Sequence, residues 1–198
     1  VAIDFYDTAG VKLLTTPTFN IPVGNKASVN PCDKNVPAGT NGSAVIRSTN
    51  SVPLIAIGKV SGANLTTTAF LGESAGAKKV GAAYIRWKVN PADGERANVA
   101  VMNVGGSAAT NVQVQYYDNQ GTLAATETLA SAGSPLGQYI KQNTNWESAS
   151  GGNTDFGVNP YGGAIEVVSD QNVVVVVRIS KNDGATVLAE DYNGVALP

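Results

Sequence analysis

One apolar segment occurs twice in the chain, and this repeat limits the possible folds more than any other feature. The later occurrence, residues 162–179, reads GGAIEVVSDQNVVVVVRI, and the earlier one, residues 42–59, reads GSAVIRSTNSVPLIAIGK. Each consists of an apolar run, a short polar turn and a second apolar run. Runs of β-branched residues bounded by turn residues are typical of buried strands rather than helices. We therefore expect one β fold that is present twice.

The segments on either side repeat in the same order. VAIDFY at the start of the chain is followed by the turn DTAG and a returning strand, and VQVQYY at residues 112–117 is followed by the turn DNQG. In both turns Asp bonds the turn backbone and Gly supplies a positive φ. The remaining acidic ligands of a calcium loop are absent, so these motifs predict turns. Further predicted strands at residues 65–71 and 185–192 end in FLG and DYNG, which supports a duplication.

Two predicted strands, residues 82–89 and 98–104, precede the second hairpin and have no counterpart before the first. A loop at residues 90–97 joins them. The resulting count of about seven strands suits an immunoglobulin-like sandwich. We predict an all-β chain with two tandem immunoglobulin-like β-sandwich domains: an incomplete one at residues 1–80, which lacks its opening strands, and a complete one at residues 81–198.

The missing strands have an energetic consequence. Their loss would expose about 400 Å² of apolar core, or roughly 10 kcal/mol, which is comparable with the whole stability of a typical domain. The chain also begins within a strand and not with a signal peptide, as a mature or truncated product would. We expect the missing strands to come either from residues before Val1 or from another chain, by strand complementation across an open edge.

Composition excludes several functions. With 13 Lys plus Arg against 15 Asp plus Glu, the net charge of −2 provides no basic surface for nucleic acid. No apolar run reaches the roughly 20 residues of a membrane helix, so we expect no membrane insertion. The absence of histidine removes Ser-His-Asp and Cys-His catalysis and His-ligated zinc. The single Cys32 lies in a polar loop without a base to activate it, so we expect no enzyme activity and no cofactor.

Three groups of residues are candidates for function. Strand sharing is expected to use apolar residues of the first repeat: Val1, Ile3, Phe5, Leu54, Ile55 and Ile57. The loop at residues 139–161 carries four aromatic rings that offer a platform for a sugar ring or a neighbouring subunit, or that cap the end of the sandwich: Tyr139, Trp146, Phe156 and Tyr161. Two Asn-x-Ser/Thr sequons make Asn41 and Asn64 candidates for glycosylation.

Longer motifs resemble a known class of protein. ANVAVMNVGGSAATNVQVQYYDNQGTL, VPAGTNGSAVIRSTNSVPLIAI and EDYNGVALP are similar to the tandem Ig-like repeats of large secreted bacterial cell-surface proteins. The similarity covers the second repeat nearly whole and the first from its hairpin onward. It departs from the usual pattern in the missing opening strands and in the enlarged aromatic loop.

The resemblance implies a fold and an extracellular or cell-surface location, and no chemistry. We expect a structural protein that self-associates into a polymer, as the subunit of a surface filament or surface layer assembled partly by inter-subunit strand complementation. The alternative is an adhesive or glycan-binding module that uses the loop at residues 139–161 to bind a surface polysaccharide.

Overall fold

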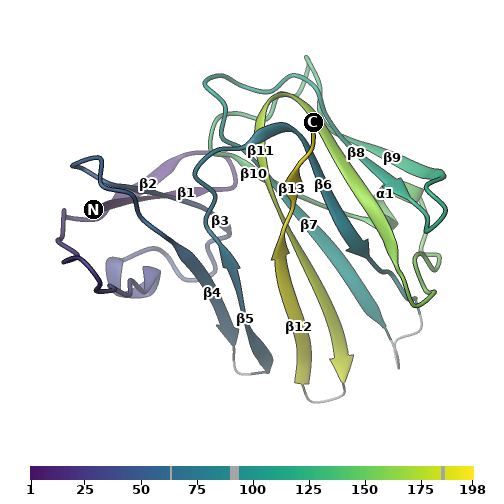
Figure 1. Cartoon of the computed structure of the whole chain (residues 1–198), viewed down its shortest axis with the longest axis horizontal. Coiled ribbons are helices and arrows are strands. Elements are labelled where there is room, and N and C mark those ends of the chain that lie inside the picture. The colour runs from purple at the N-terminus through teal and green to yellow at the C-terminus, as the bar shows by residue number, and fades with distance from the viewer. Residues whose placement is uncertain (63, 90–93, 184–185) are drawn as a thin grey trace.

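The computed structural model of the chain describes residues 1–62, 64–89, 94–183 and 186–198. The chain is nearly all β, with 53% strand and 5% helix, which confirms the predicted all-β class. The strands form a three-stranded sheet and a ten-stranded sheet (Figure 1). No helix in the described ranges is long and apolar enough to cross a membrane.

The first half of the chain contains five strands and a 3₁₀ helix: β1 (Ala2–Asp7), β2 (Lys12–Thr15), η1 (Pro31–Lys34), β3 (Gly42–Arg47), β4 (Ile57–Gly62) and β5 (Leu65–Leu71). The second half contains eight strands and one short helix: β6 (Ala77–Ile85), β7 (Glu95–Asn103), β8 (Val112–Tyr117), β9 (Leu123–Ala130), β10 (Lys141–Asn145), α1 (Trp146–Ser150), β11 (Gly163–Asp183), β12 (Thr186–Asn193) and β13 (Val195–Ala196).

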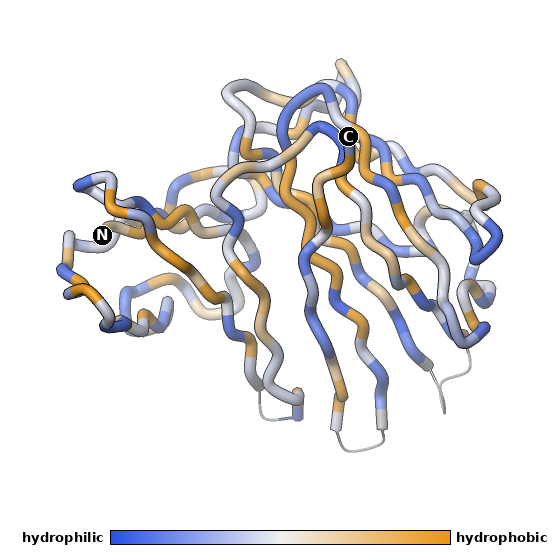
Figure 2. Tube along the Cα trace, in the orientation of Figure 1, coloured by the Kyte–Doolittle hydropathy of each residue, from blue (hydrophilic) through white to orange (hydrophobic). Residues whose placement is uncertain are grey.

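The long strand β11 organises the second half because it belongs to both layers of a sandwich. Its first part pairs with β6 and β8, and its later part pairs with β7 and β12. The core lies between these two groups of strands, and the apolar stripes of Figure 2 run along them. The short polar turn predicted between the two apolar runs of residues 162–179 is wrong, since one strand continues through this segment. The Asp170 carboxylate accepts hydrogen bonds from the backbone N–H and the hydroxyl of Thr110 there.

The central position of β11 in the sandwich explains its run of five valines, residues 173–177. Val173, Val175 and Val177 are at most 2% exposed and face the core, whereas Val174 and Val176 between them are half-buried. A strand flanked by neighbours on both edges and partly covered on both faces has few positions that require a polar residue. The run therefore marks the central strand of the molecule.

The first half repeats part of this arrangement. β1 lies between β2 and β3, as β8 lies between β9 and β11. Ile3 pairs with Ile46 in the first half, and Val114 pairs with Val167 in the second. The segment that corresponds to β11 is nevertheless divided into β3 and β4, with no strand at residues 48–56. Pro53 and the lack of flanking strands explain the interruption.

The halves are joined by hydrogen bonds. β12 pairs with β5 in parallel, so the ten-stranded sheet continues through β5 to β4 at its end (Figure 1). The predicted domain boundary after residue 80 falls inside β6. The predicted strands at residues 82–89 and 98–104 correspond to β6 and β7, which both begin earlier. Residues 90–93 of the predicted loop, and residue 185 at the start of a predicted strand, lie outside the described residues.

Candidate functional site: the open edges of the first half

Among the described residues, three strands of the first half are paired on one side only: β2, β3 and β4. Within the described part of the chain, β3 pairs with β1 alone and β4 pairs with β5 alone. The corresponding parts of β11 carry a further strand, β6 beside the first part and β7 beside the second. Among the described residues, β3 and β4 have no neighbours in the positions that β6 and β7 hold beside β11.

The side chains beside these free edges are poorly covered. Ile46 of β3 is 44% exposed, whereas Val167, which holds the equivalent pairing position in β11, is completely buried. Ala44 is also exposed, whereas its equivalent Ile165 is 3% exposed. Equivalent apolar positions are therefore covered by a further strand in the second half and exposed to solvent in the first.

The six strand-sharing candidates separate into two groups. Ile3 and Phe5 are buried in β1, which is paired on both edges, and the half-buried Val1 donates its terminal amine to the carbonyl of Phe19 at 2.8 Å. By contrast, three residues at or just before β4 are exposed: Leu54 (39%), Ile55 (90%) and Ile57 (65%). These three form the accessible part of the predicted set.

A buried carboxylate holds the small sheet together. The Asp4 side chain is fully buried and forms ion pairs with Arg47 of β3 and Lys12 of β2, while the Thr15 hydroxyl donates to it at 2.5 Å. The hydrogen bond from Arg47 keeps the Asp4 pKa far below its usual range. Strand alternation along VAIDFY places Asp4 on the face opposite Ile3 and Phe5, and the sequence did not predict its burial. Asp4 stands in a short apolar strand, and each neighbouring strand carries a basic residue. This pattern in the sequence could have indicated a buried ion pair.

Side chains also bridge the halves where β5 meets β12. Asn193 accepts from the backbone N–H of Leu71 at 3.1 Å and donates to its carbonyl at 2.8 Å, which replaces two ladder hydrogen bonds. The Thr68 hydroxyl donates to Asp191 at 2.6 Å, and Arg178 binds the same carboxylate at 2.8 Å. Burial opposes ionisation of Asp191, but these two partners still lower its pKa. The free edge at β4 is therefore firmly attached to the second half.

The aromatic loop does not form an exposed platform. Trp146 and Phe156 are each 7% exposed and stack on one another with centroids 4.2 Å apart, and both rings contact Tyr116 in the core. Tyr139 is half-buried against Tyr6. Of the four predicted rings only Tyr161 is freely exposed, at 77%. The burial of Trp146 and Phe156 favours the second of the two interpretations of these rings, in which they cap the end of the sandwich.

The sequence did not predict the short helix α1 that starts at Trp146. The side chain of Asn145 caps its first turn by accepting from the N–H of Ser148, and Gly151 ends it in the left-handed region. These capping residues were the available signal.

The two sequons are accessible. Asn41 and Asn64 are both exposed, and Asn64 directly precedes β5. The Asn41 amide oxygen accepts from Lys141 at 2.7 Å, and the Thr66 hydroxyl of the second sequon donates to the carbonyl of Val187 at 2.9 Å. Cys32 is exposed in η1.

A separate group of polar atoms is buried between β8, β9 and β10. The hydroxyls of Tyr116 and Thr144 and the Oε2 atom of Glu127 have no hydrogen-bond partner. Burial raises the pKa of Glu127 to about 7. Burial and the nearby charge of Glu127 both raise the pKa of Tyr116, while the Thr144 hydroxyl lowers it. This group can take up or release a proton near neutral pH.

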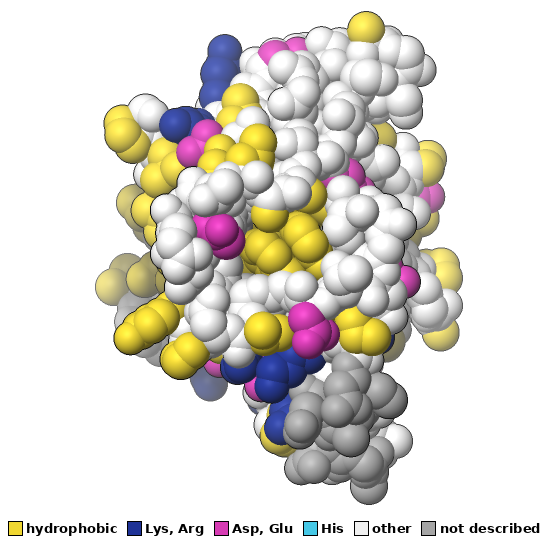
Figure 3. Space-filling view, turned by 90° about the vertical axis from the view of Figure 1, so that its right-hand side faces the viewer, with side chains coloured by type: hydrophobic (Ala, Val, Ile, Leu, Met, Phe, Trp, Pro, Cys, Tyr) yellow, Lys and Arg dark blue, Asp and Glu magenta, His cyan; other side chains and the backbone are white. Residues whose placement is uncertain are grey.

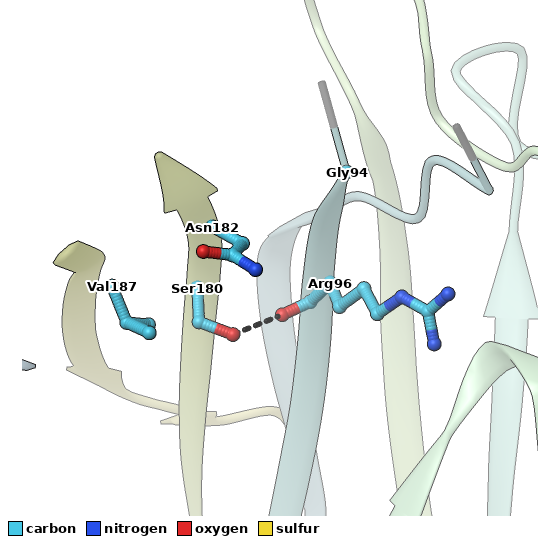
Figure 4. A pocket seen from close by; sticks show the side chains of 5 residues that line it. All are labelled: Gly94, Arg96, Ser180, Asn182 and Val187. Atoms are coloured by element: carbon cyan, nitrogen blue, oxygen red, sulfur yellow. Dashed lines mark hydrogen bonds between the residues drawn. The ribbon is translucent and has the colours of Figure 1, made fainter. Parts of the chain in front are cut away.

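Two surface hollows lie on the second half of the chain. One, with a volume of about 330 Å³, lies over the ends of β7, β11 and β12, where the Ser180 hydroxyl donates to the carbonyl of Arg96 at 3.4 Å (Figure 4). The described residues contain no group of three His, Cys, Asp or Glu side chains able to hold a metal ion. On the face shown in Figure 3, the charged side chains are scattered around a central group of apolar ones.

Comparison with known proteins adds little. No protein-family model matches the chain, and no curated protein matches it. A solved structure described as "Crystal Structure of Thermotoga maritima 1070" is similar to part of it, with 11% sequence identity and a TM-score of 0.43. The similarity covers 62% of this chain and 96% of that one. A likeness at this level supports no argument about function.

Proposed function

We propose that the protein is an extracellular structural subunit of a surface filament or surface layer, in which strands of a neighbouring subunit complete the first half. In this proposal both halves derive from one immunoglobulin-like sandwich unit, as the resemblance to bacterial surface repeats implies. Among the described residues, the first unit has no counterparts of β6 and β7. The resulting polymer is the functional form of the protein.

One observation carries the proposal: Ile46 is 44% exposed, whereas Val167 at the equivalent pairing position is completely buried. An apolar strand that is covered in one half and bare in the other indicates a place for an additional strand. An exposed strand edge pairs readily with another chain, and proteins that do not use such an edge usually protect it. The pairing of β6 and β7 with β11 provides the pattern for the added strands.

The adhesive alternative has less support. A glycan platform needs several exposed rings on one surface, and the stacked pair Trp146 and Phe156 is buried. Only Tyr161 has the required exposure. We therefore favour assembly over glycan binding.

Light scattering and electron microscopy of the purified protein test the proposal. We expect concentration-dependent assembly, and we expect Ile46→Asp to weaken it by about tenfold or more because a charge would be buried at the contact. Val23→Asp is the matched control, since Val23 is fully exposed and lies outside every strand. A wild-type chain that stays monomeric at high concentration, with no assemblies in the microscope, would refute the proposal.

A further inference from the structure

The strand β4 ends the ten-stranded sheet with an apolar and weakly protected edge. Its outer side has no strand partner among the described residues. Ile57 is 65% exposed, and Leu71, its pairing partner in β5, is 56% exposed; Ile55 just before the strand is 90% exposed. Lys59 is the only charged residue in β4. Natural edge strands are usually protected by several charges, a proline or a bulge. β4 has one charge, and its pairing with β5 is irregular only at its later end, between Val60 and Gly62.

The hydrogen bonds to β5 identify which backbone groups point outward. The carbonyl of Ala56 accepts from the N–H of Gly72 at 2.8 Å, so Ala56 faces β5. In an antiparallel pair, alternate residues direct both their N–H and their C=O to the same edge. Ile57 and Lys59 therefore present their N–H and C=O groups to the free edge, with Gly58 between them directed back to Phe70.

The second half shows the direction that an added strand takes. β7 runs antiparallel to the later part of β11, which corresponds to β4. A two-fold axis perpendicular to the sheet would place the β4 strand of a second molecule in this same antiparallel direction. Two-fold contacts of this kind use the same surface on both partners and are the commonest in protein dimers.

We propose that two copies of this chain pair through their β4 strands, with the two-fold axis at Gly58. This pairing rests on the proposed function and identifies the partner edge: each β4 provides the other with the strand that β7 provides to β11. It joins the two ten-stranded sheets into one continuous sheet, and the dimer is the unit from which the larger assembly is built.

The side chains of β4 fit this register. With Gly58 opposite Gly58 of the second molecule, each Ile57 lies opposite Lys59 of the other. Both residues direct their N–H and C=O groups outward, as a hydrogen-bonded antiparallel pair requires. The aliphatic part of each lysine covers an exposed isoleucine, and the two ammonium groups are kept apart. Gly58 has no side chain, so the two β4 backbones can approach closely at the axis. The Phe70 ring lies over Gly58 at the position where a Cβ would stand.

The first test removes one outward N–H from each molecule. Lys59→Pro deletes a donor on the free edge without deleting a ladder bond to β5. We expect it to weaken dimerisation by about tenfold or more in light scattering. The matched control Lys59→Ala keeps the N–H and loses only the aliphatic cover of Ile57, so it should weaken dimerisation much less than Lys59→Pro. Circular dichroism of both variants checks that the fold is intact.

A disulfide test reports the register directly. In a Cys32→Ser background, the double variant Ile57→Cys/Lys59→Cys should oxidise to a covalent dimer, because directly opposed residues have Cα atoms about 5.5 Å apart, which a disulfide spans. Ile57→Cys alone should not crosslink, since the two residues 57 lie diagonally.

The possible outcomes separate this pairing from the proposed function. A wild-type chain that stays monomeric refutes both. A wild-type chain that assembles, together with a Lys59→Pro variant that assembles equally well, refutes the β4 pairing and leaves assembly through another edge, such as β3. Efficient crosslinking by Ile57→Cys alone refutes the Gly58-centred register.

Discussion

Glu127 lies in β9 near Tyr116 of β8, and the buried Oε2 atom of Glu127 has no hydrogen-bond partner. Burial disfavours the charged carboxylate and raises the pKa of Glu127 to about 7. A raised carboxyl pKa stabilises the fold fully below the ordinary value near 4.5, and this contribution is lost as the pH rises through 7. The chain has no histidine to titrate in the same range.

We therefore expect the free energy of unfolding to fall by on the order of 2 kcal/mol between pH 5 and pH 8. Glu127→Gln should remove most of this dependence, because the amide is neutral at both values. Urea unfolding of the wild type and the variant at pH 5, 6, 7 and 8 measures it. Parallel pH profiles for the two proteins would show that Glu127 is not responsible.

At the scale of single elements, β3 and the first part of β11 can be compared directly, because they hold equivalent places in the two halves. Ile46 and Val167 occupy equivalent pairing positions, opposite Ile3 and Val114. Only Val167 is enclosed by a further strand, β6. The energetic effect of a side chain in this position should therefore depend on the covering strand and not on the strand that carries it.

Truncating each residue to alanine tests this dependence. Val167→Ala creates a cavity in a closed core and should cost about 2–3 kcal/mol. Ile46→Ala should lower the free energy of unfolding of the monomer by less than about 1 kcal/mol, although it removes more carbon atoms. The reason is that the Ile46 side chain is already 44% exposed to solvent. Denaturant unfolding at concentrations where light scattering shows a single chain gives both values. Equal losses would mean that the first half is closed by other contacts in solution.

At the scale of the whole molecule, β4 and β5 of the first half belong to the same ten-stranded sheet as the second half, whereas β1, β2 and β3 form a separate sheet. The core cluster consists entirely of second-half residues, such as Val99, Val114 and Val175, and the buried residues of β1 lie outside it. Backbone amides in elements with few buried contacts open at lower free energy than those in a closed core. The first half should therefore exchange its amide hydrogens earlier.

Hydrogen exchange read by mass spectrometry checks this expectation. In dilute monomer, peptides from β3 and β4 should exchange at least about tenfold faster than those from β8 and β11. At assembling concentrations the protection of β3 and β4 should rise, while that of β8 stays constant. Protection that is already high in the monomer, or unchanged on assembly, would contradict an open first half.

The sequence by itself determined the all-β class and the two hairpins with Asp-x-x-Gly turns. These follow from local information, because alternation, β-branched runs and Asp-x-x-Gly turns act over a few residues. Tertiary structure decided which apolar residues are exposed. Ile3 and Ile57 look alike in sequence, yet one lies in a strand paired on both edges and the other in a strand at the end of a sheet. It likewise buried Asp4, Trp146 and Phe156, since burial depends on which distant segments cover a residue, and sequence spacing does not record that.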